Sequence, residues 1–170
     1  MRWILDSCTL IYLIKAKLFS EFMDLIKFPL VIDSSVYEEV VIKGKAKNYP
    51  DANEAESALN KFKIPVISIN VSQELNRFND PGESSCYILA KEDGICLTSD
   101  DRAYNKFLSE DLKVIRVDSF YFEMLNQNHI DEEKFFSILK KLEKINATKA
   151  KSILFFMEKL KKRRDESNND

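Results

Sequence analysis

Short apolar runs and helically spaced apolar positions alternate along the first two thirds of the chain. Five apolar runs predict strands, at residues 3–6, 30–33, 65–69, 95–98 and 113–117. Between these runs, apolar residues recur at steps of three and four, which is typical of amphipathic helices. Strands that alternate with helices indicate a parallel sheet covered on both faces. We therefore predict a three-layer α/β/α fold with a central parallel sheet of about five strands.

Polar segments and glycines set the predicted limits of the helices. Residues 43–53 are polar and contain Gly44 and Pro50, which predicts a loop before a helix at 54–63. A helix is expected over 83–92, and Gly94 is expected to end it as a C-terminal glycine.

The last part of the chain has a different pattern, with predicted helices at 131–142 and 147–160. The second of these carries an apolar stripe, formed by Ile153, Leu154, Phe156, Met157 and Leu160. Side chains of this size favour burial, so the helix must pack on its own domain, on a second copy or on a partner. We predict a main domain over residues 1–125 and a helical extension over 126–165.

Composition narrows the class of protein. With 170 residues, of which 45 % are apolar, the chain suits one domain with a small extension. The net charge of −2 leaves nucleic-acid contact to local basic patches.

Cysteines and apolar runs indicate where the protein is found. The three cysteines lack a C-x-x-C spacing, which indicates reduced thiols. The uncharged run at residues 7–14 is too short to cross a membrane. We therefore expect a cytoplasmic protein that is not membrane-bound. The single His129 argues against His-based zinc motifs and a Ser-His-Asp triad.

Four acidic residues are candidates for a metal site. Asp6 follows the first predicted strand and Asp100 the fourth, so their carboxylates face each other if these strands are neighbours. Glu83 opens a helix, and Glu39 lies one turn into another. Taken singly, each acid could serve only its helix dipole or a solvated face. Gathered together, they would repel one another without a cation, and their hard oxygen ligands suit Mg²⁺ or Mn²⁺.

These residues also carry a resemblance to a known family. The sequence resembles the PIN domain, the fold of many VapC toxins and of related RNA-processing nucleases, over about residues 1–125. The matching segments occur in the family's order, at residues 4–7, 36–40, 82–84 and 97–101.

The resemblance implies functions for particular residues. It makes Asp6, Glu39, Glu83 and Asp100 the catalytic, metal-binding acids. Glu39 matches better than Glu38, because the second acid of the family lies three residues after an apolar residue, here Val36.

The resemblance also implies supporting residues. Ser7 and Thr98 match hydroxyl positions that orient the carboxylates, and Asp101 matches a paired acid found in some relatives. Cys8 departs from the family, where Ser or Asn is common at this position. Cys86 lies near Glu83 in sequence, without a neighbouring histidine or basic pair that would activate a thiol.

Basic residues flank the fourth acid at helical spacing. Arg102 and Lys106 could steer phosphate toward the metal, or they could simply form a solvated helix face.

Three classes of function remain open. The first is a metal-dependent endoribonuclease, either the toxin of a toxin–antitoxin pair or a housekeeping RNA-processing factor. The second is a non-catalytic PIN-like scaffold that binds RNA or protein. The third is another α/β protein, such as a receiver or a phosphatase. A receiver needs a phosphate-accepting Asp after its third strand, where this chain has Asn70. An aspartate phosphatase prefers D-x-D after its first strand, and here Cys8 stands in place of the second acid. Because relatives often dimerise, we expect a homodimer with RNA and an antitoxin as partners, and with residues 161–164 at its rim.

Overall fold

The chain forms two compact units. The computed structural model describes residues 1–78 and 80–167. The first unit spans Met1–Val117 and the second Asp118–Asp170. The predicted domain limits, 1–125 and 126–165, stay a prediction. No helix in the described parts of the chain is both long enough and apolar enough to cross a membrane.

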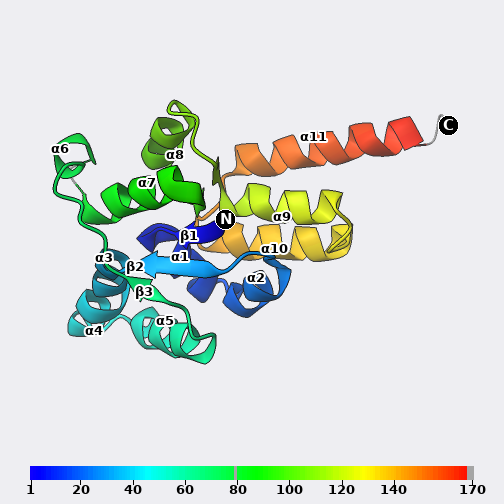
Figure 1. Cartoon of the computed structure of the whole chain (residues 1–170). Coiled ribbons are helices and arrows are strands. Elements are labelled where there is room, and N and C mark those ends of the chain that lie inside the picture. The colour runs from blue at the N-terminus through cyan, green and yellow to red at the C-terminus, as the bar shows by residue number, and fades with distance from the viewer. Residues whose placement is uncertain (79, 168–170) are drawn as a thin grey trace. The chain divides into compact units, whose positions relative to one another are not determined.

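The first unit is built on five parallel strands, as the sequence predicts (Figure 1). They are β1 (Arg2–Leu5), β2 (Leu30–Asp33), β3 (Val66–Ile67), β4 (Gly94–Leu97) and β5 (Val114–Ile115). Their order in the sheet is β3-β2-β1-β4-β5, and Trp3 of the central strand pairs with Leu30 on one side and Ile95 on the other. The strand order reverses between β1 and β4, so the carboxyl ends of these two neighbours meet at a switch point.

Helices connect the strands and form the outer layers. Their bounds in the first unit are α1 (Ser7–Lys15), α2 (Phe19–Leu25), α3 (Ser34–Tyr37), the π-helix η1 (Glu38–Lys43), α4 (Gly44–Ala46), α5 (Pro50–Lys61), α6 (Leu75–Phe78), α7 (Pro81–Asp93) and α8 (Asp101–Leu108). The sequence did not predict α6. The predicted three-layer α/β/α fold is confirmed.

The two faces of the sheet belong to separate apolar cores. On one face, Ile4 and Cys96 pack in a buried cluster with α7 and with Phe107 of α8. On the other face, Trp3 lies edge-on to Phe22 of α2, with 6.2 Å between ring centroids. Successive side chains of a strand point to opposite faces, so the neighbours Trp3 and Ile4 anchor opposite layers.

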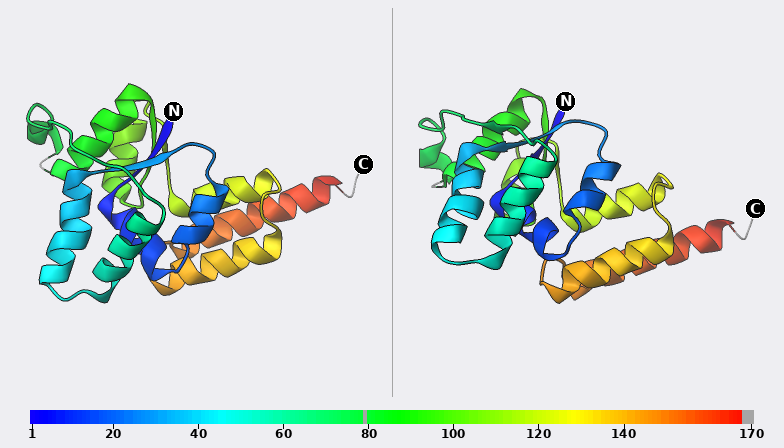
Figure 2. Two further views of the ribbon diagram at one scale, coloured as in Figure 1. Left: turned by 60° about the horizontal axis from the view of Figure 1, so that its bottom comes forward. Right: turned by 90° about the horizontal axis from the view of Figure 1, so that it is seen from below.

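The segment predicted as a loop, 43–53, is mostly helical. α3, η1 and α4 follow one another without a break through residues 34–46, and α5 begins at Pro50 beside them (Figure 2). Proline is favourable in this first helical position, where its missing N–H would have no partner. Gly44 is needed for packing and not for a turn, because a Cβ there would lie 2.8 Å from the Cβ of Ala52. The prediction was wrong because a polar surface helix and a loop have similar composition.

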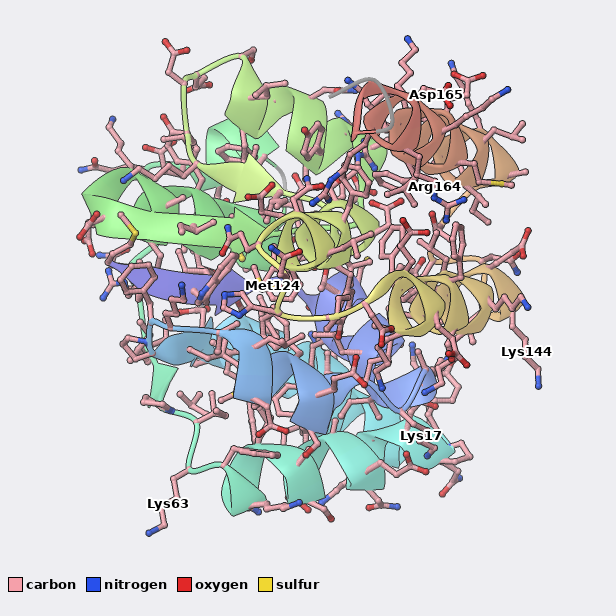
Figure 3. The ribbon with its side chains drawn as sticks, turned by 90° about the vertical axis from the view of Figure 1, so that its right-hand side faces the viewer. Lys17, Lys63, Met124, Lys144, Arg164 and Asp165 are labelled. Carbon is pink, nitrogen blue, oxygen red and sulfur yellow. The ribbon has the colours of Figure 1, made fainter. Side chains whose placement is uncertain are left out.

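Several helices are followed by a non-glycine residue in the left-handed conformation. After α4, Asn48 has a φ of 57°, its N–H donates to the carbonyl of Lys45, and the Tyr49 N–H donates to that of Gly44. This pair of bonds is the Schellman motif. Lys17 and Lys63, labelled in Figure 3, follow α1 and α5 in the same conformation, and the Lys63 side chain points away from the sheet.

Gly94 does not end α7 in the predicted way. Its backbone is extended, with a φ of −111°. A Cβ at this position would lie 2.1 Å from Cδ1 of Ile4 and 2.8 Å from the carbonyl oxygen of Leu89. Glycine is therefore required because α7 and β1 approach each other closely here.

The second unit is helical. Its helices are α9 (Val117–Asn126), which begins at the last residue of the first unit, α10 (Glu132–Lys144) and α11 (Ala150–Ser167). Phe156 holds them together, with ring centroids 4.8 Å from Phe122 and 5.6 Å from Phe135. The Thr148 hydroxyl also donates a buried hydrogen bond of 2.6 Å to Asp118.

The predicted apolar stripe on the last helix divides into buried and exposed residues. Phe156 and Leu160 are each 3 % exposed, as expected. Leu154 is 60 % exposed and Met157 49 %, so part of the stripe is open to solvent in the single chain. A homodimer that would cover these residues stays a prediction.

Candidate active site

Asp6 lies directly after β1 and is held through both carboxylate oxygens. It caps α1, where Oδ1 accepts a 2.7 Å hydrogen bond from the Thr9 N–H. Its Oδ2 accepts a short hydrogen bond from the Thr98 hydroxyl. Thr98 is fully buried just beyond β4, so the bond joins the ends of the two central strands.

Asp100 lies shortly after β4, beyond Thr98 and Ser99. It caps α8 by accepting 2.8 Å hydrogen bonds from the N–H groups of Arg102 and Ala103. Its own N–H donates to the Thr98 hydroxyl at 3.2 Å. One threonine oxygen thus binds both to the Asp6 side chain and to the Asp100 backbone.

Glu39 joins this edge through the residue next to Asp6. The Ser7 hydroxyl donates a 2.6 Å hydrogen bond to Oε2 of Glu39. The adjacent Glu38 instead forms a 3.3 Å ion pair with Lys43, and both are exposed. The structure therefore places Glu39, and not Glu38, beside Ser7.

Glu83 lies in the first turn of α7, next to an acid that sequence reasoning missed. Asp80 caps this helix and accepts a 2.8 Å hydrogen bond from the Glu83 N–H. Burial is the main cause that raises the pKa of Glu83, and the charges of Asp80 and Asp100 add to it. Arg102 and Lys106 act in the opposite direction. An acid before Pro81 at the start of a helix is a capping signal, which could have identified Asp80.

Burial and the negative charge at this edge both raise the pKa of the Cys8 thiol. Packing around the sulfur removes hydration, and the charges of Asp6, Asp100, Glu39 and Asp80 follow as causes, in that order. Together they raise the pKa to about 12, although Cys8 keeps some exposed surface. Four carboxylates therefore act on one sulfur atom. A thiolate is strongly disfavoured here, which argues against Cys8 as a nucleophile.

Burial raises the pKa of Asp6 itself. Hydrogen bonds from Thr98 and Thr9 oppose this effect, and the charge of Asp100 adds to it. Two acids with raised pKa at one edge of a parallel sheet form an environment that a cation would stabilise.

The supporting residues have defined contacts. Asp101 forms a 2.6 Å ion pair with Arg116. The Lys106 ammonium lies 3.8 Å from the ring centroid of Phe78 and also acts on the charge of Glu83. Arg102 is exposed on the first turn of α8. The charges of both predicted phosphate-contact residues thus act on Glu83.

The donor set fits a hard divalent cation. Its ligands would be carboxylate oxygens, which Mg²⁺ and Mn²⁺ prefer. In the arrangement described for residues 1–78 and 80–167, no three His, Cys, Asp or Glu side chains are close enough to hold a metal ion together. Asp6 and Asp100 accept from helix N–H groups and Glu39 from a hydroxyl, so each is held by protein donors.

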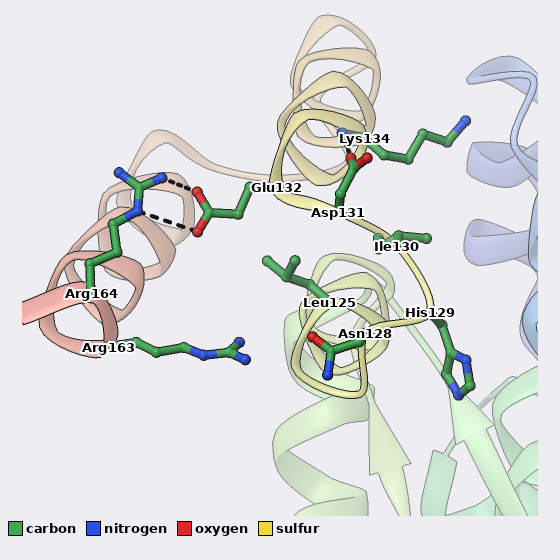
Figure 4. Close-up of a pocket in the computed structure, with 9 residues that line it drawn as sticks. All are labelled: Leu125, Asn128, His129, Ile130, Asp131, Glu132, Lys134, Arg163 and Arg164. Carbon is green, nitrogen blue, oxygen red and sulfur yellow. Dashed lines mark hydrogen bonds and ion pairs between the residues drawn. The ribbon is translucent and has the colours of Figure 1, made fainter. Parts of the chain in front are cut away.

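The second unit also contains a cavity, with a volume of about 1040 Å³ (Figure 4). Its charged side chains are already engaged. Glu132 forms an ion pair with Arg164, and Arg163 donates to Asn126 at 3.4 Å. Asp131 caps α10 by accepting from the Lys134 N–H. We assign no chemistry to this cavity.

The family model "DUF3368: PIN domain" matches residues 2–155. Among solved structures, the chain is similar to a domain of a functionally unknown protein from Methanocaldococcus jannaschii DSM 2661. The two share 19 % identity with a TM-score of 0.49, over 68 % of this chain and 90 % of the other. A search of curated proteins gives no match.

Proposed function

The chain belongs to the PIN-domain family, and we propose that it is a metal-dependent endoribonuclease that hydrolyses RNA phosphodiester bonds. The acids at the carboxyl edge of the sheet would form its active site. They are Asp6, Glu39, Glu83 and Asp100.

One observation carries this proposal. The Thr98 hydroxyl donates to the Asp6 carboxylate and accepts from the Asp100 N–H, at the ends of two neighbouring parallel strands. This contact fixes two acids of distant sequence at the switch point, where ligands of parallel sheets bind. Raised pKa values of Asp6 and Glu83 support a site that functions with a bound cation.

Each residue has a proposed role. Asp6, Glu39, Glu83 and Asp100 would hold Mg²⁺ or Mn²⁺, which when bound supplies an activated water and neutralises phosphate charge. Thr98 would orient Asp6, and Ser7 would orient Glu39, through the hydrogen bonds described above. Arg102 and Lys106 would attract the RNA phosphates.

The proposal extends to the substrate and the partners of the protein. We propose RNA as substrate, a second copy of the chain as partner and, if the protein is a toxin, an antitoxin. The alternative is a PIN-like scaffold that binds RNA or protein without cleaving it. It is favoured by the absence of a ready-made cluster of three ligands among the described residues.

An assay on labelled RNA tests the proposal. The purified chain should cleave RNA with Mg²⁺ or Mn²⁺ and leave 5′-phosphate and 3′-hydroxyl ends. Chelation of the metal by EDTA should stop the reaction, because the acids alone supply no activated water. RNA binding without cleavage at any metal concentration would favour the scaffold, and full activity in EDTA would exclude a metal mechanism.

Binding of metal should stabilise the protein in a pH-dependent way. A carboxyl group whose pKa is higher in the folded than in the unfolded state destabilises the fold as pH rises through that interval. Asp6 and Glu83 are such groups. Since a metal binds their ionised forms, millimolar Mn²⁺ should raise the Tm more at about pH 7 than at about pH 5. Thermal melts measure this, and a Tm that ignores Mn²⁺ at every pH would contradict the site.

A further inference from the structure

A second cavity begins beside the candidate active site. It has a volume of about 430 Å³ and lies in the first unit. Its lining includes the acids Glu39 and Asp80 together with Lys43, Lys47 and Tyr49. A volume of this order suits a small organic ligand such as a nucleotide. We refer to this cavity as the Tyr49 groove.

The helix that forms one wall of the groove places acids and bases on one side. Glu39, Lys43 and Lys47 follow one another at steps of four, from the π-helix η1 to the end of α4. Residues four apart lie near each other on a helix surface. Short π-helical segments are frequent at functional sites. The groove therefore runs from a proposed metal ligand toward basic side chains.

Tyr49 presents an aromatic ring to solvent from a fixed backbone. Its N–H is bonded to the carbonyl of Gly44, and Pro50 follows it at the first position of α5. The close contact between Gly44 and Ala52 fixes the two helices on either side. Even so, Tyr49 is 52 % exposed. Packing in the core does not account for this ring, so the groove has an exposed aromatic surface on a fixed backbone.

One lysine that lines the groove is available to bind a ligand. Lys43 is paired with Glu38 at 3.3 Å, and Asp51 with Lys15 at 3.7 Å. Lys47 forms no ion pair with any described part of the chain. Its ammonium lies 6.0 Å from the ring centroid of Tyr49. A ligand that reaches this ring would therefore meet an available positive charge.

We propose that the Tyr49 groove binds one unpaired nucleotide of the RNA substrate, with its base stacked on Tyr49 and a phosphate near Lys47. Single-stranded RNA is recognised by such pairs of aromatic and basic side chains, because every base has a stacking face and every link a phosphate. The inference rests on the proposed function, since RNA is the ligand. A base that is paired in a duplex could not stack on this ring.

Binding of a fluorescent single-stranded RNA oligonucleotide in EDTA tests this without cleavage. Measured by anisotropy, Tyr49→Leu should weaken the affinity about 5- to 150-fold, the range expected for loss of one stacked base. Tyr49→Phe should retain it, because the ring is kept. Lys47→Gln should weaken binding and reduce its dependence on salt. A double-stranded RNA of the same length should bind more weakly and be insensitive to Tyr49→Leu.

Matched controls lie at the opposite edge of the sheet. Phe28 is 40 % exposed just before β2, and Lys27 precedes it. Phe28→Leu and Lys27→Gln should leave RNA affinity unchanged, and each variant's Tm reports whether it is folded. Equal affinities of the wild type and a folded Tyr49→Leu, or no RNA binding by the wild type, would overturn the inference. RNA binding that depends on Tyr49 without cleavage in Mn²⁺ would support the groove and contradict the nuclease.

Discussion

Asp100→Asn should lower the rate of metal-dependent RNA cleavage by about 100-fold or more while the protein stays folded. The loss is large because a catalytic metal supplies several kcal/mol of transition-state stabilisation, and each 1.4 kcal/mol is about tenfold in rate. The fold should survive because Asp100 also caps α8 through Arg102 and Ala103, and asparagine caps helices about as well as aspartate. Single-turnover cleavage in Mn²⁺, with a thermal melt of the same sample, measures both effects.

Two further variants make this result specific. Asp6→Asn should behave in the same way, since it too caps a helix and loses only its charge. Asp24→Asn is the matched control, because Asp24 is exposed on α2, a helix whose acids take no part in the proposed site. Normal cleavage by a folded Asp100→Asn protein would remove Asp100 from the active site.

Gly94→Ala should lower the free energy of unfolding by about 1–3 kcal/mol, the usual effect of overpacking a core. The added methyl group would lie 2.1 Å from Cδ1 of Ile4 and 2.8 Å from the carbonyl of Leu89. The loss of backbone freedom in the unfolded chain favours alanine by only about 0.4–1 kcal/mol, so the clash dominates. The Tm should fall by about 2–4 °C for each kcal/mol. Urea unfolding at constant m-value measures the change.

A second substitution tests the cause. Ile4→Val removes Cδ1, the atom nearest to the new methyl group, and by itself should cost about 0.5–1.5 kcal/mol. In Gly94→Ala with Ile4→Val, the total loss should be smaller than the sum of the single losses. Strict additivity would show that the contact with Ile4 is not the source of the destabilisation.

The resemblance that supports the family assignment was visible in short segments of sequence. Asp6 and Asp100 each follow an apolar run. In a sheet of parallel strands connected by helices, residues that follow strands lie at the carboxyl edge of the sheet, whatever the connecting sequence. This reasoning placed Asp6 and Asp100 at the carboxyl ends of strands, because strand periodicity and chain direction are local properties. The structure meets the condition that the sequence left open, since β1 pairs with β4.

Other features depend on contacts between segments that are distant in sequence. Nothing local distinguishes Glu39 from Glu38 except a family pattern, whereas in the structure Ser7 bonds to one and Lys43 to the other. Gly94 suggested a helix end, yet its role comes from Ile4, ninety residues away.

The sequence by itself determined the alternation of strands and helices, the parallel sheet and the acids that follow its strands. Each of these depends on periodicity along the chain. Only the tertiary structure decided that Asp80 shares the acidic edge, that α3, η1 and α4 follow one another without a break, and that an exposed Tyr49 lines the same groove as Glu39. These depend on which side chains meet across the fold, because the partner of a polar group and the room for a Cβ are properties of the neighbouring segment.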